Sequence, residues 1–149
     1  NKEAKHYIES YLAHYSGVDS YMKNVVEKAN ADGYVETMFG RRRNLPELTS
    51  SKHMIRAFGE RVARNMPIQG TAADIIKIAM IKVDERMKAE NLRARLVLQV
   101  HDELIVEAPQ DESMRVALIV QEEMENAVKM SVPLTADAAI GRTWYDAKG

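Results

Sequence analysis

Two apolar runs, residues 94–100 and 103–108, flank a short polar bend and constrain the fold of this chain more than any other feature. The residues at the bend are His101, Asp102 and Glu103. Because a two-residue connection is the commonest way to join antiparallel strands, the pattern predicts a β-hairpin whose tip carries acids.

Alternation along the first run predicts which side chains share a face of this hairpin. Successive residues of a strand point to opposite faces, so Leu96, Leu98 and Val100 are expected on one face. Val97 and Gln99 are expected on the other.

The acids at the bend can be interpreted in two ways, as part of a metal site or as a solvated turn. On a stiff hairpin they could hold a divalent metal ion, which needs hard oxygen ligands with little freedom to relax. Alternatively, His and Asp are ordinary turn residues and the tip is simply solvated. The strongly apolar flanking strands place the hairpin in the core, which favours the metal site.

Apolar periodicity predicts most of the remaining elements. Pro67 is expected to interrupt a long helix because it lacks a backbone donor. The expected helices cover residues 2–15, 18–31, about 51–66, 68–87 and 110–128, and the further strands cover 34–38, 42–45 and 134–140. The sequence thus predicts one α+β unit of hairpins, packed helices and an edge strand.

Composition narrows the class of protein. The 149 residues suffice for one domain with a real core, and 46% hydrophobic with 29% charged residues is ordinary for a globular protein. There is no cysteine, so disulfides and thiolate metal sites are excluded and a cytoplasmic location is expected. No apolar run reaches membrane-spanning length. A net charge of −1 means that any DNA contact must come from local basic patches.

Arg61, Asn65 and Gln69 are spaced four apart and share one helix face if the helix continues through Pro67. This polar row of hydrogen-bond donors could follow the minor groove of DNA, where every base pair offers an acceptor in the same place. The alternative is a polar, solvent-facing helix edge.

Arg41, Arg42 and Arg43 form a basic cluster at the bend of the earlier hairpin. They could contact DNA phosphates, which adds affinity without sequence information. They could equally be a solvated turn, and the sequence leaves both readings open.

The run from Val100 to Glu103 resembles the third sequence motif of the family A DNA polymerases, the DNA polymerase I type. Other stretches resemble that family in the same order along the chain. They are Gly33-Tyr34-Val35-Glu36-Thr37, Gly40-Arg41-Arg42-Arg43, Leu45-Pro46, Glu60-Arg61, Pro67-Ile68-Gln69-Gly70-Thr71-Ala72-Ala73-Asp74-Ile75-Ile76, Val132-Pro133-Leu134 and Gly141-Arg142-Thr143-Trp144. The resemblance implies a polymerase palm fragment in which an antiparallel catalytic hairpin packs on long helices.

The resemblance also implies a division of the chain. Residues 1–50 would be the end of the fingers with a connecting hairpin, and 51–149 the palm with the catalytic hairpin. The family's upstream Asp-containing strand and nucleotide-gripping fingers helix do not occur in this sequence. We therefore expect the C-terminal piece of a polymerase, inactive alone, whose partner is the missing N-terminal part.

The implied reaction is template-directed DNA synthesis by two-metal phosphoryl transfer. The primer 3′ hydroxyl would attack the α-phosphate of a deoxynucleoside triphosphate, with two Mg²⁺ ions ~4 Å apart. Asp102 would bridge the ions together with the upstream Asp. Glu103 would have a lesser, outer-shell role because it points to the other side of the strand. His101 would touch the primer backbone, and the polar row would contact primer and template near the growing end.

Two other functions stay open. A single-subunit RNA polymerase uses a related His-Asp hairpin, although Glu103 and the run 69–74 favour a DNA polymerase. Alternatively, the chain alone is a non-catalytic DNA-binding or assembly module. An apolar face that upstream segments normally cover would then promote association.

Overall fold

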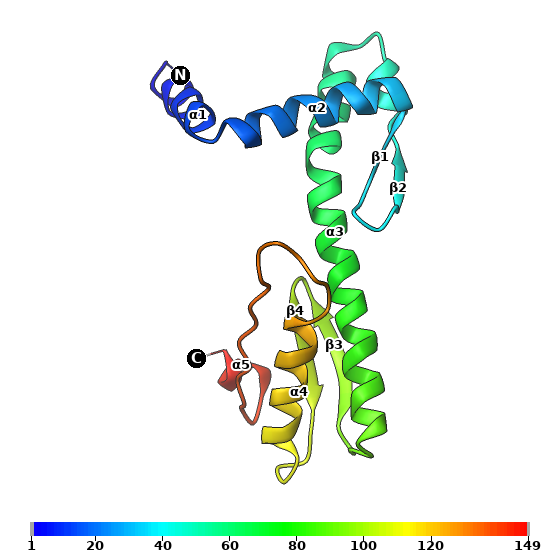
Figure 1. Ribbon diagram of the computed structural model, residues 1–149, viewed down its shortest axis with the longest axis vertical. Coiled ribbons are helices and arrows are strands. Elements are labelled where there is room, and N and C mark those ends of the chain that lie inside the picture. The colour runs from blue at the N-terminus through cyan, green and yellow to red at the C-terminus, as the bar shows by residue number, and fades with distance from the viewer. Residues whose placement is uncertain (1, 149) are drawn as a thin grey trace. The chain divides into compact units, whose positions relative to one another are not determined.

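The computed structural model describes residues 2–148 and divides the chain into two compact units, Asn1–Thr71 and Ala72–Gly149. Figure 1 shows the elements of each unit, with colour following residue number. The division falls inside helix α3 (His53–Ala89). The boundary expected at residue 50, between the end of the fingers and the palm, is a different division of the chain. It stays a prediction.

The first unit consists of helices around a short hairpin. Its elements before α3 are α1 (Lys2–His14), α2 (Ser16–Asp32), β1 (Tyr34–Glu36), β2 (Arg42–Asn44) and the 3₁₀-helix η1 (Pro46–Thr49). Gly33 ends α2 in the left-handed conformation, at φ 78°, and its N–H donates to the carbonyl of Ala29. Glycine suits this position because it adopts positive φ without steric cost.

The core of the first unit joins α2, the β1 strand, the η1 region and α3. Its buried side chains are Ala29, Val35, Leu45, Leu48 and Ala63. This core fixes the β1–β2 hairpin against the early turns of α3.

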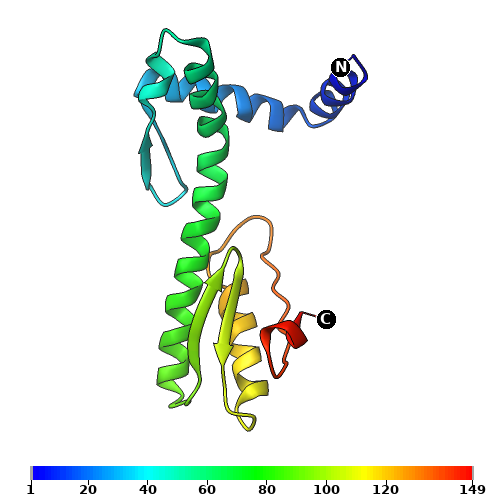
Figure 2. The ribbon, with the colours of Figure 1, turned by 180° about the vertical axis from the view of Figure 1, so that it is seen from behind.

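The second unit packs one face of a longer hairpin against helices. Its elements after α3 are β3 (Arg95–Val100), β4 (Glu103–Glu107), α4 (Ser113–Glu125) and α5 (Trp144–Ala147). The buried core consists of Val83, Met87, Ala94, Val116 and Ile119. Helix α4 covers one face of the hairpin, which lies behind α4 in Figure 1 and in front of it in Figure 2.

The predicted hairpin at residues 94–108 is confirmed, and so is the α+β class. β3 and β4 are antiparallel, and Val100 pairs with Glu103 across a two-residue turn. The hairpin predicted over 34–45 is also present but shorter, with Val35 opposite Arg43.

The predicted sharing of faces along β3 holds for Leu98 and Val100 but is wrong for Leu96. The register pairs Leu96 with Val106 but Leu98 with Ile105, so Val97 is an extra residue that forms a β-bulge. Because a bulge shifts the alternation by one residue, Leu96 faces the core whereas Leu98 lies on the opposite face and is 47% exposed.

The predicted interruption at Pro67 is also wrong. Helix α3 is continuous from His53 to Ala89 with Pro67 inside it. An internal proline costs about 3 kcal/mol, and burial of neighbouring side chains such as Ala63 and Met66 offsets this cost.

The predicted strand over 134–140 is absent. These residues have no regular secondary structure, and among the described residues the sheet that contains β3 has two strands. A strand needs a neighbouring ladder for its backbone hydrogen bonds, whereas the N–H of Ala136 donates to the Glu125 carboxylate at 3.2 Å. The short helix α5 that follows was not predicted.

Over residues 2–148, no helix combines the length and the apolar character that crossing a membrane would require.

Candidate functional site

The tip of the β3–β4 hairpin is held in one conformation. Its turn consists of His101 and Asp102, and His101 has φ 52°, in the left-handed region. A positive φ is needed in the two-residue turns that match the twist of β-hairpins, and it costs a non-glycine residue about 1 kcal/mol. The Gln99 amide donates to the His101 carbonyl at 2.6 Å and braces the turn. The tip is therefore a rigid support for its side chains.

The two neighbouring carboxylates of the tip lie in different environments. Asp102 is exposed at the apex of the turn, whereas Glu103 begins β4 and is partly buried. The register places Glu103 on the same face as Ile105, away from the core. The register fixes the side of Glu103 alone, so the expectation that the two acids point in different directions stays a prediction.

Glu103 has an ion-pair partner in α5. Its Oε1 lies 3.3 Å from the Nζ of Lys148. Its Oε2 is buried and has no hydrogen-bond partner among residues 2–148. Burial of an unpaired carboxylate oxygen is unfavourable, and Lys148 is the cation that the structure places beside this carboxylate.

The hairpin tip offers part of a metal site. Within residues 2–148 no cluster of three or more His, Asp and Glu side chains could hold a metal ion. Mg²⁺ is usually bound through one or two carboxylates, with water and substrate phosphates as the other ligands. The exposed oxygens of Asp102 fit such a partial ligand set.

The polar row lies where the sequence predicts it. Because α3 continues through Pro67, Arg61, Asn65 and Gln69 share one face of an unbroken helix, and all three are exposed. The Arg61 guanidinium lies 5.8 Å from the centroid of the Phe58 ring. The row is thus available for contact with another molecule.

The three arginines of the β1–β2 bend have separate roles in the first unit. Arg41 donates to the carbonyl of Gly70 at 2.9 Å. Arg42 pairs with Glu36 at 3.2 Å and lies 4.4 Å from the centroid of a tyrosine ring. Arg43 is exposed at the centre of β2. The three adjacent arginines thus have different surroundings. Arg41 and Arg42 are bound within the first unit, whereas the exposed Arg43 is the best placed of the three to contact another molecule.

Sequence reasoning missed a contact that docks the β1–β2 hairpin on α3. A Cβ added at Gly70 would lie 2.7 Å from the Cγ2 of Thr37. The next residue, Thr71, accepts a hydrogen bond from the N–H of Met38 at 3.0 Å. A glycine inside a helical pattern often marks such a close approach. Gly70 was therefore the feature of the sequence from which this contact could have been predicted.

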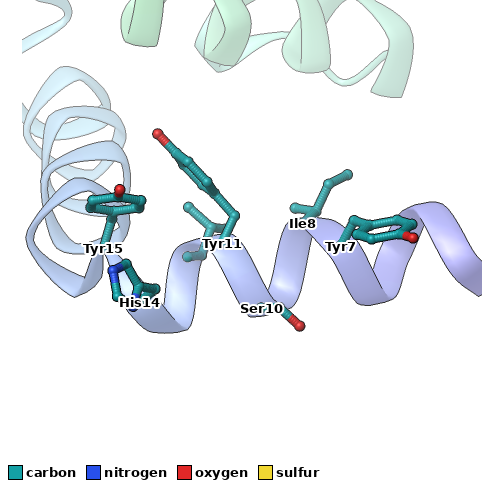
Figure 3. Close-up of a pocket in the computed structure, with 7 residues that line it drawn as sticks. Tyr7, Ile8, Ser10, Tyr11, His14 and Tyr15 are labelled. Atoms are coloured by element: carbon teal, nitrogen blue, oxygen red, sulfur yellow. The ribbon is translucent and has the colours of Figure 1, made fainter.

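Helix α1 and Tyr15, which follows it, carry an exposed surface of aromatic and apolar side chains, called here the aromatic surface of α1. Tyr7, Ile8, Tyr11 and Tyr15 are between 49% and 66% exposed, and the rings of Tyr11 and Tyr15 have centroids 4.8 Å apart. Figure 3 shows Ile8 and Tyr11 on one side of the helix and Ser10 on the other. An exposed surface of this kind is typical of a contact with another polypeptide segment.

The family model of DNA polymerase family A matches residues 1–146. The chain belongs to this family. It is 54% identical to DNA polymerase I of Bacillus caldotenax over 147 residues, which are 99% of this chain and 17% of the relative. DNA polymerase I of Bacillus subtilis (strain 168) is 52% identical with the same coverage.

A solved structure has the same fold. It is the POL domain of Pol1 from M. smegmatis in complex with DNA primer-template and dNTP, with a TM-score of 0.96 and 47% identity. The match covers 99% of this chain and 26% of that chain. The family resemblance read from the sequence and the fold class are thus confirmed.

Proposed function

We propose that this chain forms part of a DNA-directed DNA polymerase and supplies a catalytic carboxylate of its active site. The reaction is the addition of a deoxynucleotide to a primer 3′ end by phosphoryl transfer. One observation carries the proposal: in a chain of this family, a rigid two-residue turn presents Asp102 at an exposed hairpin tip.

Asp102 is the proposed metal ligand. Its carboxylate is exposed, and the braced turn fixes the backbone from which it projects. Magnesium bound there would activate the primer hydroxyl and stabilise charge on the triphosphate, as in two-metal phosphoryl transfer. A second Asp from another polymerase segment would complete the ligand set, because two close divalent cations need shared anionic oxygens.

Glu103 and His101 have supporting roles in this proposal. Glu103 acts from the outer shell, since its Oε1 is already paired with Lys148. His101 is exposed beside Asp102 and contacts the primer backbone near its terminus.

The polar row reads the shape of the new base pair in the minor groove. Arg61, Asn65 and Gln69 are exposed donors on one helix face. Minor-groove acceptors lie at the same place in every correct pair, so the row can test pairing without reading sequence. Arg43 adds a phosphate contact, and Arg41 and Arg42 are assigned weaker roles because each is bound within the first unit.

The proposed partners are primer-template DNA, deoxynucleoside triphosphates and a further segment of the polymerase. The M. smegmatis structure contains DNA primer-template and dNTP, which supports the first two. The aromatic surface of α1 supports the third. Identity of 54% to a DNA polymerase I favours this proposal over an RNA polymerase.

The test is a chimera in which this chain replaces the 147 matching residues of the B. caldotenax polymerase. We expect Mg²⁺-dependent primer extension with deoxynucleotides, and much less with ribonucleotides. We expect no extension by this chain alone. A folded chimera that binds primer-template but does not extend it would contradict the proposal, and preference for ribonucleotides would support the RNA polymerase instead.

A further inference from the structure

Contacts in and around α5 restrict the position of Lys148. Thr143 and Asp146 form a capping box, in which the N–H of Asp146 donates to the Thr143 hydroxyl at 3.2 Å and the N–H of Thr143 donates to the Asp146 carboxylate at 3.1 Å. The preceding chain is tightly folded, since a Cβ at Gly141 would lie 2.6 Å from the backbone nitrogen of Ala147. Lys148 follows α5 directly, and its Nζ lies 5.0 Å from the centroid of the Trp144 ring. Such a cation–π contact restricts where the ammonium group can lie.

This ammonium group is directed at Glu103. The Nζ–Oε1 distance is 3.3 Å, whereas Oε2 is buried and finds no hydrogen-bond partner in the part of the chain that the structure describes. Lys148 is thus the partner the structure gives to a carboxylate next in sequence to Asp102. Without Lys148, the Glu103 carboxylate would gain partners by turning toward water or toward a cation at the tip.

We infer that Lys148 is a positioning residue that keeps Glu103 out of the metal site at the hairpin tip. This inference rests on the proposed function, which makes Asp102 the metal ligand. With Lys148 in place, Asp102 is the exposed carboxylate of the tip that would bind the cation. Without it, Glu103 becomes a second anionic ligand, and cation affinity rises with the charge of the ligand set.

The test uses Mn²⁺ alone as the probe on the ¹⁵N-labelled chain. Mn²⁺ prefers oxygen ligands as Mg²⁺ does, and it broadens the amide signals of nearby residues. Broadening at residues 99–104 as a function of Mn²⁺ concentration gives an apparent affinity for the tip. This measurement needs no catalytic activity.

Lys148→Gln is expected to tighten Mn²⁺ binding at the tip about three- to fivefold, the scale of an exposed ion pair. Lys148→Arg keeps the charge and reach, so it is expected to restore the original affinity. Arg142→Gln is the matched control, because it removes the same charge from an exposed position just before α5.

Repeating Lys148→Gln in a chain that carries Glu103→Gln tests whether Lys148 acts through its ion pair with Glu103. The alternative is a general electrostatic effect of removing one positive charge. If Lys148 acts through Glu103, Lys148→Gln has no further effect there. An equal gain in that background, or no gain in the original chain, would overturn the inference.

Asp102→Asn makes the two proposals distinguishable. Loss of tip broadening in this variant supports Asp102 as the ligand, whatever Lys148 does. If broadening persists while the Lys148 variants behave as expected, the assignment of Asp102 fails and the link between Lys148 and Glu103 stands.

Discussion

The side chain of Thr71 on α3 accepts a hydrogen bond from the backbone N–H of Met38, at 3.0 Å. The same hydroxyl donates to the carbonyl of Pro67 at 2.5 Å. Thr71 is only 7% exposed, and Thr37, which precedes Met38, is 4% exposed. This pair of bonds attaches the β1–β2 hairpin to the helix that carries the polar row.

Thr71→Val keeps the shape of the side chain but removes the acceptor of the Met38 N–H. This bond is partly buried, and a typical intramolecular hydrogen bond contributes about 0.5–1.5 kcal/mol. We expect that loss in the free energy of unfolding, measured by urea denaturation. Thr71→Ser retains the hydroxyl and is expected to lose less. Equal stability of the Val and Ser variants would show that the bond contributes nothing.

Gly70→Ala tests the close approach of the hairpin to α3. The new Cβ would lie 2.7 Å from the Cγ2 of Thr37, so the hairpin must move. We expect destabilisation by about 1–3 kcal/mol, the usual cost of overpacking. Gly17→Ala in α2 is the control, because no atom lies within 4 Å of its Cβ position. Gly17 lies in the first turn of α2, so there we expect little change or a small gain from helix propensity. A gain at Gly70 would refute the packing argument.

Sequence reasoning succeeded where the determining interactions are local. Apolar runs on either side of His101 and Asp102 were enough to predict the hairpin and its turn. It failed where the outcome depends on partners distant in sequence. The bulge at Val97 is a property of the register between two strands, and the ion pair between Lys148 and Glu103 joins separate segments.

Gln69→Ala tests minor-groove reading in the polymerase chimera. Loss of one hydrogen bond in a partly desolvated interface is expected to weaken primer affinity by about 1–2 kcal/mol. Extension from mismatched ends is expected to fall as well, measured as single-turnover rates on matched and mismatched primers. Arg56→Ala is the control, since Arg56 is exposed and lies about 140° around the helix from Arg61. Unchanged rates and affinity for Gln69→Ala would remove it from the proposed interface.

The ion pairs around Glu90 predict a pH dependence of stability in the second unit. The Arg115 guanidinium, whose Nε lies 2.6 Å from Oε2, is the main cause that lowers the pKa of the Glu90 carboxyl. A carboxyl whose pKa is lowered by folding stabilises the native state above its unfolded pKa. That contribution is lost as the pH falls through the lower, native value.

Arg115→Gln should therefore reduce stability at neutral pH, and the difference from the original chain should shrink as the solution is acidified. Urea denaturation at a series of pH values measures this. Lys77→Gln, at an exposed position of α3, is the control for the change in charge. A difference that stays constant down to strongly acid pH would contradict the role of the ion pair.

The candidate site shows the same limit of sequence reasoning. The spacing of Arg61, Asn65 and Gln69 was sufficient to predict a shared helix face, once the helix is continuous. The separate environments of Arg41, Arg42 and Arg43 depend on contacts with α3 and β1, which their adjacency in sequence does not reveal.

The most direct test of the central claim is the single-turnover extension rate of the chimera carrying Asp102→Ala. Loss of a metal ligand removes several kcal/mol of charge stabilisation, so we predict a fall of about a thousandfold or more with primer-template affinity nearly unchanged. Asp137→Ala, at an exposed position of the second unit, should leave the rate unaltered. A near-normal rate for Asp102→Ala would contradict the account.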